Sequence, residues 1–403
     1  MTGAEPRKAE PHKAEAAARV EAARGRILGV SHALHACPEP GWQEHRSVAL
    51  IGEALTRAGL ELEAGTAGLP TAFTAGAGSG ERVVALVAEY DALAGLGHAC
   101  GHNVIAAAAV GAALALAPVA DELGITVRVL GTPAEEGGGG KIVMLEQGVF
   151  DDVDLALMIH PGPADSAYAR PRAVAHFDVE YTGHEAHAAA YPQLGVNAAD
   201  AFTVAQVAIG LLRQQLPDDV RVHGMVREAG TAPNAIPGSA IGSWYVRAAD
   251  LEQLDALFPR IAACFEAGAL ATGCAMRITE TSGRYAEFRN DERLLAAFVA
   301  NAAALGRDMD ADELRPGGMN TASTDMGNVS RVVRAIHPYL GINSLPAVNH
   351  QAAFADAAAT PAADRAALDG AILLAQTVID DVLLPAKPHH EAISPAKHHH
   401  EEA

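Results

Sequence analysis

Apolar residues recur along the chain with two different periods. Helical spacing extends from Ala17 to Leu34 and again from Asn103 to about Leu123. Short apolar runs of the length of buried strands lie at 82–88, which is rich in valine, and at 125–130 and 153–159. Because helical stretches separate these runs, the sequence predicts an α/β fold with a mixed, mostly parallel sheet covered by helices.

The pattern changes after about Arg170. Polar and apolar residues alternate from Ala173 to His187, another strand-like run covers 240–246, and helical spacing covers 198–216 and 250–268. These elements predict a smaller α+β domain at 171–284, inserted into a larger domain formed by 17–170 and 285–386. Two polar ends without an apolar face, 1–16 and the histidine-rich 387–403, are predicted to be flexible tails.

Composition narrows the classes of partner. The formal charge is −20, so nucleic acid and anionic membranes are poor partners for the chain as a whole. The N-terminus has no signal-peptide pattern, and the longest apolar stretch, Val104 to Ala117, is too short to cross a membrane and reads as a buried helix. The four cysteines form no disulfide framework. These features favour a cytoplasmic protein.

Side chains capable of catalysis follow each of the three short apolar runs. Cys100 and His102 follow the first, Glu135 and Glu136 the second, and His160 the third. Because the carboxyl ends of parallel strands meet at one edge of a sheet, we expect these side chains to lie together. A thiolate, imidazoles and carboxylates suit zinc, and also manganese, cobalt or nickel.

The adjacent glutamates can divide two tasks, because neighbouring side chains diverge. One carboxylate can bind metal while the other acts as a general base. Asp91 is a candidate to orient a histidine ligand through a hydrogen bond. The glycines 137–140 leave room for a substrate, and they lack the Lys-Ser/Thr of a phosphate-binding loop. Taken singly, Cys100 could be a small buried hydrophobe, and a histidine or a pair of glutamates could be surface residues. Their combination at successive strand ends favours a metal site.

Several motifs occur in the order typical of one family: HALHACPEPGWQEH, EYDALAGLGHACGHN, GTPAEEGGGGK, HPGP, GHEAHAAAYPQLGVNA, GTAPNAIP, STDMGNVS and AVNHQAAF. Over nearly its whole length the chain resembles the dinuclear metallohydrolases that include aminoacylases, hippurate hydrolases, indole-acetyl-amino-acid hydrolases and p-aminobenzoyl-glutamate hydrolase. It is most similar to the branch of β-alanyl-lysine-type dipeptidases and the B-type subunit of p-aminobenzoyl-glutamate hydrolase. The resemblance implies a zinc-exopeptidase-like catalytic domain with an inserted lid and dimerisation domain.

The resemblance also implies a role for each matching residue. Two divalent metal ions per subunit, zinc first among them, would share Cys100 as a bridging ligand. The remaining ligands would be His102, Glu136, His160 and His350. Glu135 would take the proton of a water that bridges the metals, and the resulting hydroxide would attack the amide carbonyl. Spacing alone did not point to His350, because it is distant in sequence from the other ligands.

The same resemblance places further residues around a substrate. His187 would reach the site of a second subunit in a homodimer and stabilise the oxyanion, and Asn234 would also bind the substrate. Arg247 would face a substrate carboxylate. Asp325 and Gly327 would belong to a loop that closes over the site.

The implied function is metal-dependent hydrolysis of an amide bond in a small molecule. A dipeptide, an N-acyl amino acid and an aryl amide would all use the residues named above, so the substrate class stays open. An alternative is a non-catalytic, metal-dependent binding or scaffold protein on the same fold. The intact Glu135 argues against it, because such a protein has no need of a general base.

Overall fold

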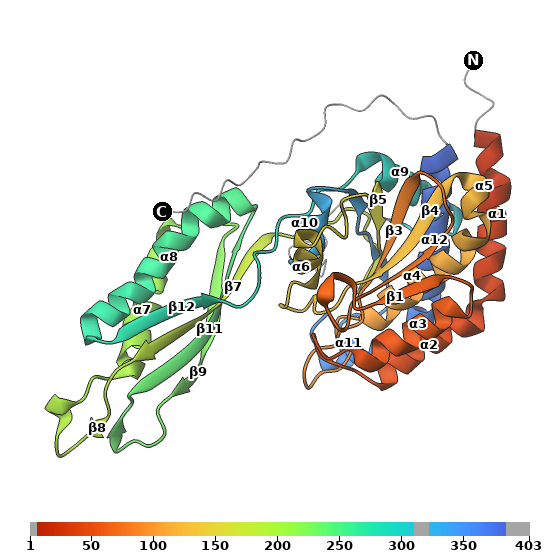
Figure 1. Ribbon diagram of the computed structural model, residues 1–403. Coiled ribbons are helices and arrows are strands. Elements are labelled where there is room, and N and C mark those ends of the chain that lie inside the picture. The colour runs from red at the N-terminus through yellow and green to blue at the C-terminus, as the bar shows by residue number, and fades with distance from the viewer. Residues whose placement is uncertain (1–5, 310–321, 384–403) are drawn as a thin grey trace.

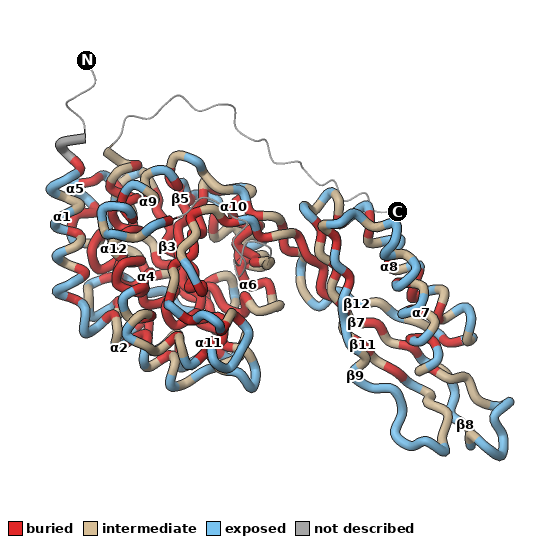
Figure 2. The backbone as a smooth tube through the Cα atoms, turned by 180° about the vertical axis from the view of Figure 1, so that it is seen from behind, coloured by how far each residue is buried: buried red, intermediate tan, exposed pale blue. Residues whose placement is uncertain are grey.

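The computed structural model describes residues 6–309 and 322–383, with side chains from Ala9 on. Two domains lie end to end, a thick one that carries both ends of the described chain and a thinner, elongated one (Figure 1). Buried backbone fills the thick domain and runs along the middle of the thin one (Figure 2). The histidine-rich tail predicted at 387–403 lies outside the described residues.

A six-stranded sheet forms the centre of the large domain. Its order is β1-β2-β4-β3-β5-β13, and β4, β3, β5 and β13 run parallel, whereas β1 and β2 pair antiparallel. The strands are β1 (Glu61–Ala64), β2 (Phe73–Ala77), β3 (Arg82–Ala88), β4 (Ile125–Gly131), β5 (Leu155–Leu157) and β13 (Arg334–Ile336). A short parallel pair, β6 (His160–Gly162) with β14 (Tyr339–Gly341), continues beyond β5 and β13. The third predicted strand, 153–159, is observed only at 155–157, and the chain pairs with a new partner from His160 on.

Both faces of β3 are buried, which explains its uninterrupted apolar run. Val84, Leu86 and Ala88 belong to one hydrophobic cluster, and Val83, Ala85 and Val87 belong to another. The first cluster includes helices α2 (Arg24–Ala36), α3 (His45–Thr56), α4 (His102–Leu116), α9 (Glu292–Ala304), α11 (Ala352–Ala357) and α12 (Pro361–Leu383). The second includes the shorter helices α6 (Gly140–Glu146) and α10 (Met326–Ser330). Helices thus cover the sheet on both sides.

Helix α4 is the core helix of the large domain. Every one of its residues is buried, and it packs against β3, α2 and α12. Together with α5 (Ala120–Leu123) it forms the one described stretch, His102–Leu123, that is long and apolar enough to cross a membrane, yet 89 % of its most apolar part is buried inside the protein. Length and composition are therefore only weak evidence for a membrane span here, because a buried core helix meets the same criteria.

The prediction of a flexible tail over 1–16 is wrong from Pro6 onward. Helix α1 (Pro6–Ala22) packs against α12 and α4 and buries Ala9, Ala16 and Val20. Arg19 also donates a hydrogen bond of 3.0 Å to the carbonyl oxygen of Ala115. Alanine is only weakly hydrophobic, so a helix face of alanines between charged residues gives little apolar periodicity. The sequence pattern therefore does not predict that this face packs.

The small domain is an antiparallel sheet with helices on one face. Its strand order is β12-β7-β11-β9, with β7 (Ala173–Thr182), β9 (Arg221–Ala229), β11 (Ser239–Ala248) and β12 (Ala275–Glu280). Helices α7 (Ala198–Leu212) and α8 (Leu251–Thr272) pack on it around a core of aromatic residues, namely Phe177, Tyr181, Phe202, Trp244 and Phe265. A two-stranded ribbon, β8 (Ala186–His187) with β10 (Ala235–Ile236), lies at the tip far from the large domain (Figure 1). The two sheets confirm the predicted fold class.

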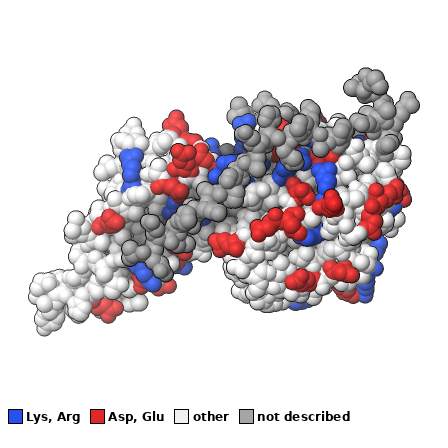
Figure 3. Space-filling model, turned by 45° about the horizontal axis from the view of Figure 1, so that its top comes forward, with Lys and Arg blue, Asp and Glu red and all other residues white. Residues whose placement is uncertain are grey.

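Acidic and basic side chains are interspersed over both domains on the face drawn in Figure 3. Many of them are paired. Arg334, for example, contacts Asp291 and Asp381, and the pKa of Asp291 is lowered because this pairing and local hydrogen bonds outweigh its burial. On this face, charges of both signs are thus mixed over the two domains.

Candidate metal centre

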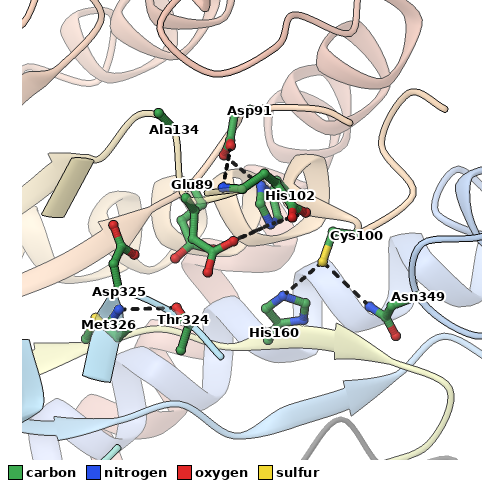
Figure 4. A network of polar contacts seen from close by, with 12 residues as sticks. Glu89, Asp91, Cys100, His102, Ala134, His160, Thr324, Asp325, Met326 and Asn349 are labelled. Carbon is green, nitrogen blue, oxygen red and sulfur yellow. Dashed lines mark hydrogen bonds and ion pairs between the residues drawn. The ribbon is translucent and has the colours of Figure 1, made fainter. Parts of the chain in front are cut away.

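Three strand ends of the large sheet deliver the predicted residues to one place (Figure 4). The Cys100 sulfur lies 3.6 Å from His160 Nε2, and His350 Nε2 lies 3.5 Å from a Glu136 carboxylate oxygen. Cys100, His102 and His160 form one compact group of donors, and Cys100, Glu136 and His350 form a second. The two groups share Cys100, as expected of a ligand that bridges two ions.

His102 is held in a fixed orientation. It begins helix α4, directly after Gly101, whose φ of 79° turns the chain into the helix. The ring Nδ1 lies 2.9 Å from Asp91 Oδ1, and the other Asp91 oxygen accepts a hydrogen bond of 2.9 Å from the Glu136 amide. Burial lowers the pKa of His102, but the Asp91 carboxylate outweighs it and raises that pKa well above the ordinary value. Asp91 therefore orients His102, as predicted, and leaves Nε2 facing the other donors.

Some buried donor atoms have no hydrogen-bond partner in the described part of the protein, and they indicate whether this site suits metal ions. His102 Nε2 and Glu136 Oε1 are both buried, lie 3.8 Å apart and accept or donate no hydrogen bond within the described chain. Burial raises the pKa of Cys100, with the Glu136 charge adding to the effect, and burial lowers the pKa of His160. A positive charge at this point would stabilise the buried Cys100 thiolate, and the lowered pKa of His160 favours the neutral imidazole that binds metal. Sulfur, nitrogen and oxygen donors together are a set that suits zinc. The residues fit divalent ions.

Glu135 lies beside the ligands with its carboxylate buried. One oxygen is 3.9 Å from His102 Nε2. Burial raises the pKa of Glu135 well above its usual range, and the charges of Glu89 and Glu136 raise it further. Such a carboxylate has a high affinity for a proton, which a general base requires.

The loop that carries the two glutamates is fixed from several sides. Glu44 accepts a hydrogen bond of 2.8 Å from the amide of Ala134, which has a φ of 54°. The Tyr285 hydroxyl donates to the Glu135 carbonyl at 2.7 Å and accepts from the Gly139 amide at 2.9 Å. These contacts fix the backbone on both sides of Glu135 and Glu136, and both carboxylates approach His102 Nε2, at 3.9 Å and 3.8 Å.

Glu89 and Lys141 belong to the site although no sequence pattern singled them out. One Glu89 oxygen lies 3.7 Å from His102 Nε2, and the other lies 2.6 Å from the Lys141 ammonium. Lys141 is fully buried and also contacts Asp325 at 2.7 Å. Glu89 directly follows β3, so the same strand-end reasoning could have found it. Lys141 is no metal ligand, and its pairing depends on a residue far along the chain.

The structure gives Asp325 and Gly327 a role other than the predicted contact with substrate. Both Asp325 oxygens accept hydrogen bonds from Lys141, at 2.9 Å from the amide and 2.7 Å from the ammonium. A Cβ atom at Gly327 would lie 2.0 Å from the Ala286 carbonyl oxygen. Asp325 therefore holds a buried cation, and Gly327 is required by close packing.

Arg247 projects from the small domain toward the large one. It donates hydrogen bonds to Ser323 at 2.6 Å and to His223 at 3.3 Å, and its guanidinium lies 5.9 Å from the Tyr245 ring centre. Burial lowers the pKa of Arg247, and the charge of Glu135 is close enough to oppose that effect. Arg247 is thus close enough to the metal centre to feel the charge of Glu135.

His187 and Asn234 lie together, but not at this metal centre. Both are exposed at the tip of the small domain, where the Ala188 amide donates to the Asn234 carbonyl at 2.9 Å. His187 Nδ1 accepts hydrogen bonds from the Ala189 and Ala190 amides. A neutral ring that accepts through Nδ1 carries its proton on Nε2, and this N–H has no hydrogen-bond partner among the described residues.

Comparison with known proteins agrees with this geometry. A family model described as Peptidase family M20/M25/M40 matches residues 85–367. The Xaa-Arg dipeptidase of Mus musculus is 40 % identical over 393 residues, covering 93 % of this chain and 90 % of that protein. The B-type subunit of p-aminobenzoyl-glutamate hydrolase from Escherichia coli (strain K12) is 34 % identical over 275 residues, covering 63 % of this chain and 57 % of that protein.

Solved structures share the fold. The aminobenzoyl-glutamate utilization protein from Klebsiella pneumoniae superposes with a TM-score of 0.68 at 21 % identity, covering 87 % of this chain and 96 % of that one. A dinuclear metal binding peptidase of the M20 family from Bacillus subtilis superposes with a TM-score of 0.64 at 24 % identity, covering 89 % and 99 %. The chain therefore belongs to peptidase family M20/M25/M40 and is a metal-dependent hydrolase of the dipeptidase type.

Proposed function

We propose that this chain hydrolyses the peptide bond of a dipeptide with two divalent ions held by the metal centre. The observation that carries the proposal is the meeting of two donor groups at Cys100, with the buried Glu135 carboxylate next to them. Zinc is the first candidate, and manganese, cobalt and nickel suit the same donors. The solved Bacillus subtilis relative, which is described as dinuclear, supports two ions.

The chain's own residues divide the chemistry. Bound divalent ions would polarise the scissile carbonyl and lower the pKa of an attacking water. Glu135 accepts the proton of that water and passes it to the leaving amine. Asp91 holds His102 in its ligating orientation, and Lys141 balances the charge of Glu89 beside it. Attack on the carbonyl creates an oxyanion. A hydrogen-bond donor opposite these groups is still needed to stabilise it.

We further propose that His187 of a second subunit supplies this donor in a homodimer formed through the small domain. Strand β9 is an exposed sheet edge, and edges of this kind pair with other chains unless they are protected. Large apolar side chains are exposed nearby on β9 and α7, namely Met225, Val207 and Leu211. His187 and Asn234 project together from the far tip, where a partner subunit could receive them.

The substrate class follows from the relatives that match nearly the whole chain. Both are Xaa-Arg dipeptidases, so we propose a dipeptide with a basic C-terminal residue, with Arg247 and Asn234 as the residues that bind its backbone. p-Aminobenzoyl-glutamate is the second candidate, because the B-type subunit of its hydrolase matches a shorter part of the chain.

Metal reconstitution tests the proposal directly. Protein stripped with a chelator and reloaded with each ion is assayed for amine release from Xaa-Arg and Xaa-Lys dipeptides, N-acyl amino acids and p-aminobenzoyl-glutamate. We expect two ions per chain and turnover of basic dipeptides only in the loaded protein. Full binding of two ions without turnover of any substrate would favour the non-catalytic binding protein instead.

A further inference from the structure

Trp42 combines exposure with an unfavourable backbone conformation. Its φ is 68°, and 41 % of the residue is exposed to solvent. Bulky side chains rarely adopt this left-handed region, where glycine or asparagine is preferred. Backbone strain of this kind persists where the surroundings enforce it, and it clusters at functional sites. An indole held in this way and left partly exposed is poorly explained by core packing.

The indole lies at the edge of the metal centre. A Cβ atom placed on Gly138, two residues after Glu136, would be 2.8 Å from Trp42 Nε1. A Cβ atom placed on the preceding Gly41 would lie 2.9 Å from the Ala134 Cβ and 3.7 Å from an Asp91 oxygen. Trp42 therefore packs against the glycine loop that follows the catalytic glutamates, and any side chain at 138 would displace it.

A second aromatic residue approaches the same loop from the small domain. A Cβ atom placed on Gly137 would lie 3.7 Å from the Tyr245 hydroxyl. Tyr245 is on β11, two residues before Arg247, and its ring lies beside the guanidinium. The glycines thus lie between Trp42 from the large domain and Tyr245 from the small one. Arg247 is positioned on the Tyr245 side, where it could bind a substrate carboxylate.

We infer that Trp42 is a specificity residue that binds the cationic side chain of the substrate's C-terminal residue against its indole face. Tryptophan offers the best aromatic face for a guanidinium or ammonium group. Gly138, whose Cβ position lies against the indole, follows Glu136 by two residues and Glu135 by three, so a side chain held on the indole stays next to the catalytic loop. This inference rests on the proposed dipeptidase function and adds the residue that selects a basic side chain.

Fluorescence tests the inference without turnover. Trp42 and Trp244 are the only tryptophans, and Trp244 is buried in the core of the small domain. A Trp244→Phe background therefore leaves Trp42 as the sole indole reporter. Titration with arginine and with citrulline, its neutral isostere, should change the emission in both cases, with arginine bound about 2- to 30-fold more tightly. Equal affinities, or no response to arginine, would overturn the inference.

Kinetics then separate this inference from the proposed function. The ratio of kcat/KM for an Xaa-Arg over an Xaa-citrulline dipeptide should fall by about 2- to 30-fold in Trp42→Leu and by less in Trp42→Phe, which keeps an aromatic face. An unchanged ratio in an active enzyme contradicts the role of Trp42 alone. Inactivity of the wild type toward every dipeptide contradicts the proposed function, and the fluorescence result still decides the inference.

A glycine variant controls for folding. Trp42→Gly removes the indole but suits a φ of 68°, so it should fold with a melting temperature close to that of the wild type while losing the preference for arginine. If Trp42→Gly keeps the wild-type preference for arginine, the indole does not select the substrate.

Discussion

The metal centre and the tip of the small domain are built in opposite ways. At the metal centre His102 is completely buried and hydrogen-bonded to Asp91, and its remaining nitrogen faces three carboxylates. At the tip His187 is exposed, and its ring accepts hydrogen bonds from the backbone of its own turn. Both histidines have one nitrogen fixed and one free. Among the described residues, only the first ring faces other candidate catalytic groups.

This difference indicates which residues are arranged for catalysis within one domain and which need contact with another protein surface. Burial and fixed hydrogen bonds let the large domain arrange its donors before any substrate arrives, which reduces the reorganisation needed during the reaction. An exposed imidazole at a remote tip gains a low-dielectric environment only when another surface covers it. The predictions below test that division of roles.

Glu135→Gln should have the largest effect on activity. Losing the general base is expected to reduce kcat by about 10²- to 10⁴-fold, because the neighbouring Glu89 pairs with Lys141 and cannot replace it. Metal content measured by elemental analysis should stay at the wild-type value. Glu146→Gln, a change of an exposed residue on the same segment, is the matched control and should leave kcat unaltered. Activity near wild type in Glu135→Gln would remove this residue from the mechanism.

Lys141→Met should lower the free energy of unfolding by about as much as Glu135→Gln raises the activation free energy. The substitution leaves the buried Glu89 and Asp325 carboxylates without their cation, which typically costs about 3–5 kcal/mol. Urea denaturation of metal-free protein measures the change. Arg128→Met breaks a more exposed pair with Asp152 and should cost less than about 1 kcal/mol. Similar losses in the two variants would show that the buried cluster has no special structural role.

His187→Ala should reduce kcat by about 10²- to 10³-fold if the tip supplies the oxyanion donor. Mixed dimers then decide which subunit it serves. A dimer of one His187→Ala subunit and one Glu135→Gln subunit contains one complete site only if His187 crosses between subunits. We expect such dimers, purified through two different tags, to recover activity that neither parent shows. Failure to recover activity would place His187 outside the partner's site.

Asp91→Asn should have the smallest of these effects. Asn keeps the size of the side chain but removes the charge that orients His102, and losing such a partner typically lowers metal affinity by about 10- to 100-fold. Competition with a chromogenic chelator measures the affinity. Asp152→Asn on the surface should leave it unchanged. An unaltered affinity in Asp91→Asn would mean that helix α4 alone positions the histidine.

Much of the site could be predicted because strand ends are encoded locally. The three short apolar runs predicted three strands, and residues that follow these strands form the cluster around Cys100. The same rule did not extend to Asp325, which pairs with a lysine 184 residues away. Nor did it reveal the packing role of alanines in α1, because an alanine face is defined only by the helices that cover it.

The sequence by itself determined the parallel strands, the inserted domain's alternating pattern and the donors at successive strand ends, because these depend on local periodicity and on the direction of neighbouring strands. Tertiary structure alone decided that Lys141 neutralises Glu89 and Asp325, and that His350 faces Glu136. It also decided that Trp42 and Tyr245 approach neighbouring glycines of one loop from different domains. Such contacts join residues far apart in the chain, and only the packing of complete domains brings them within interaction distance.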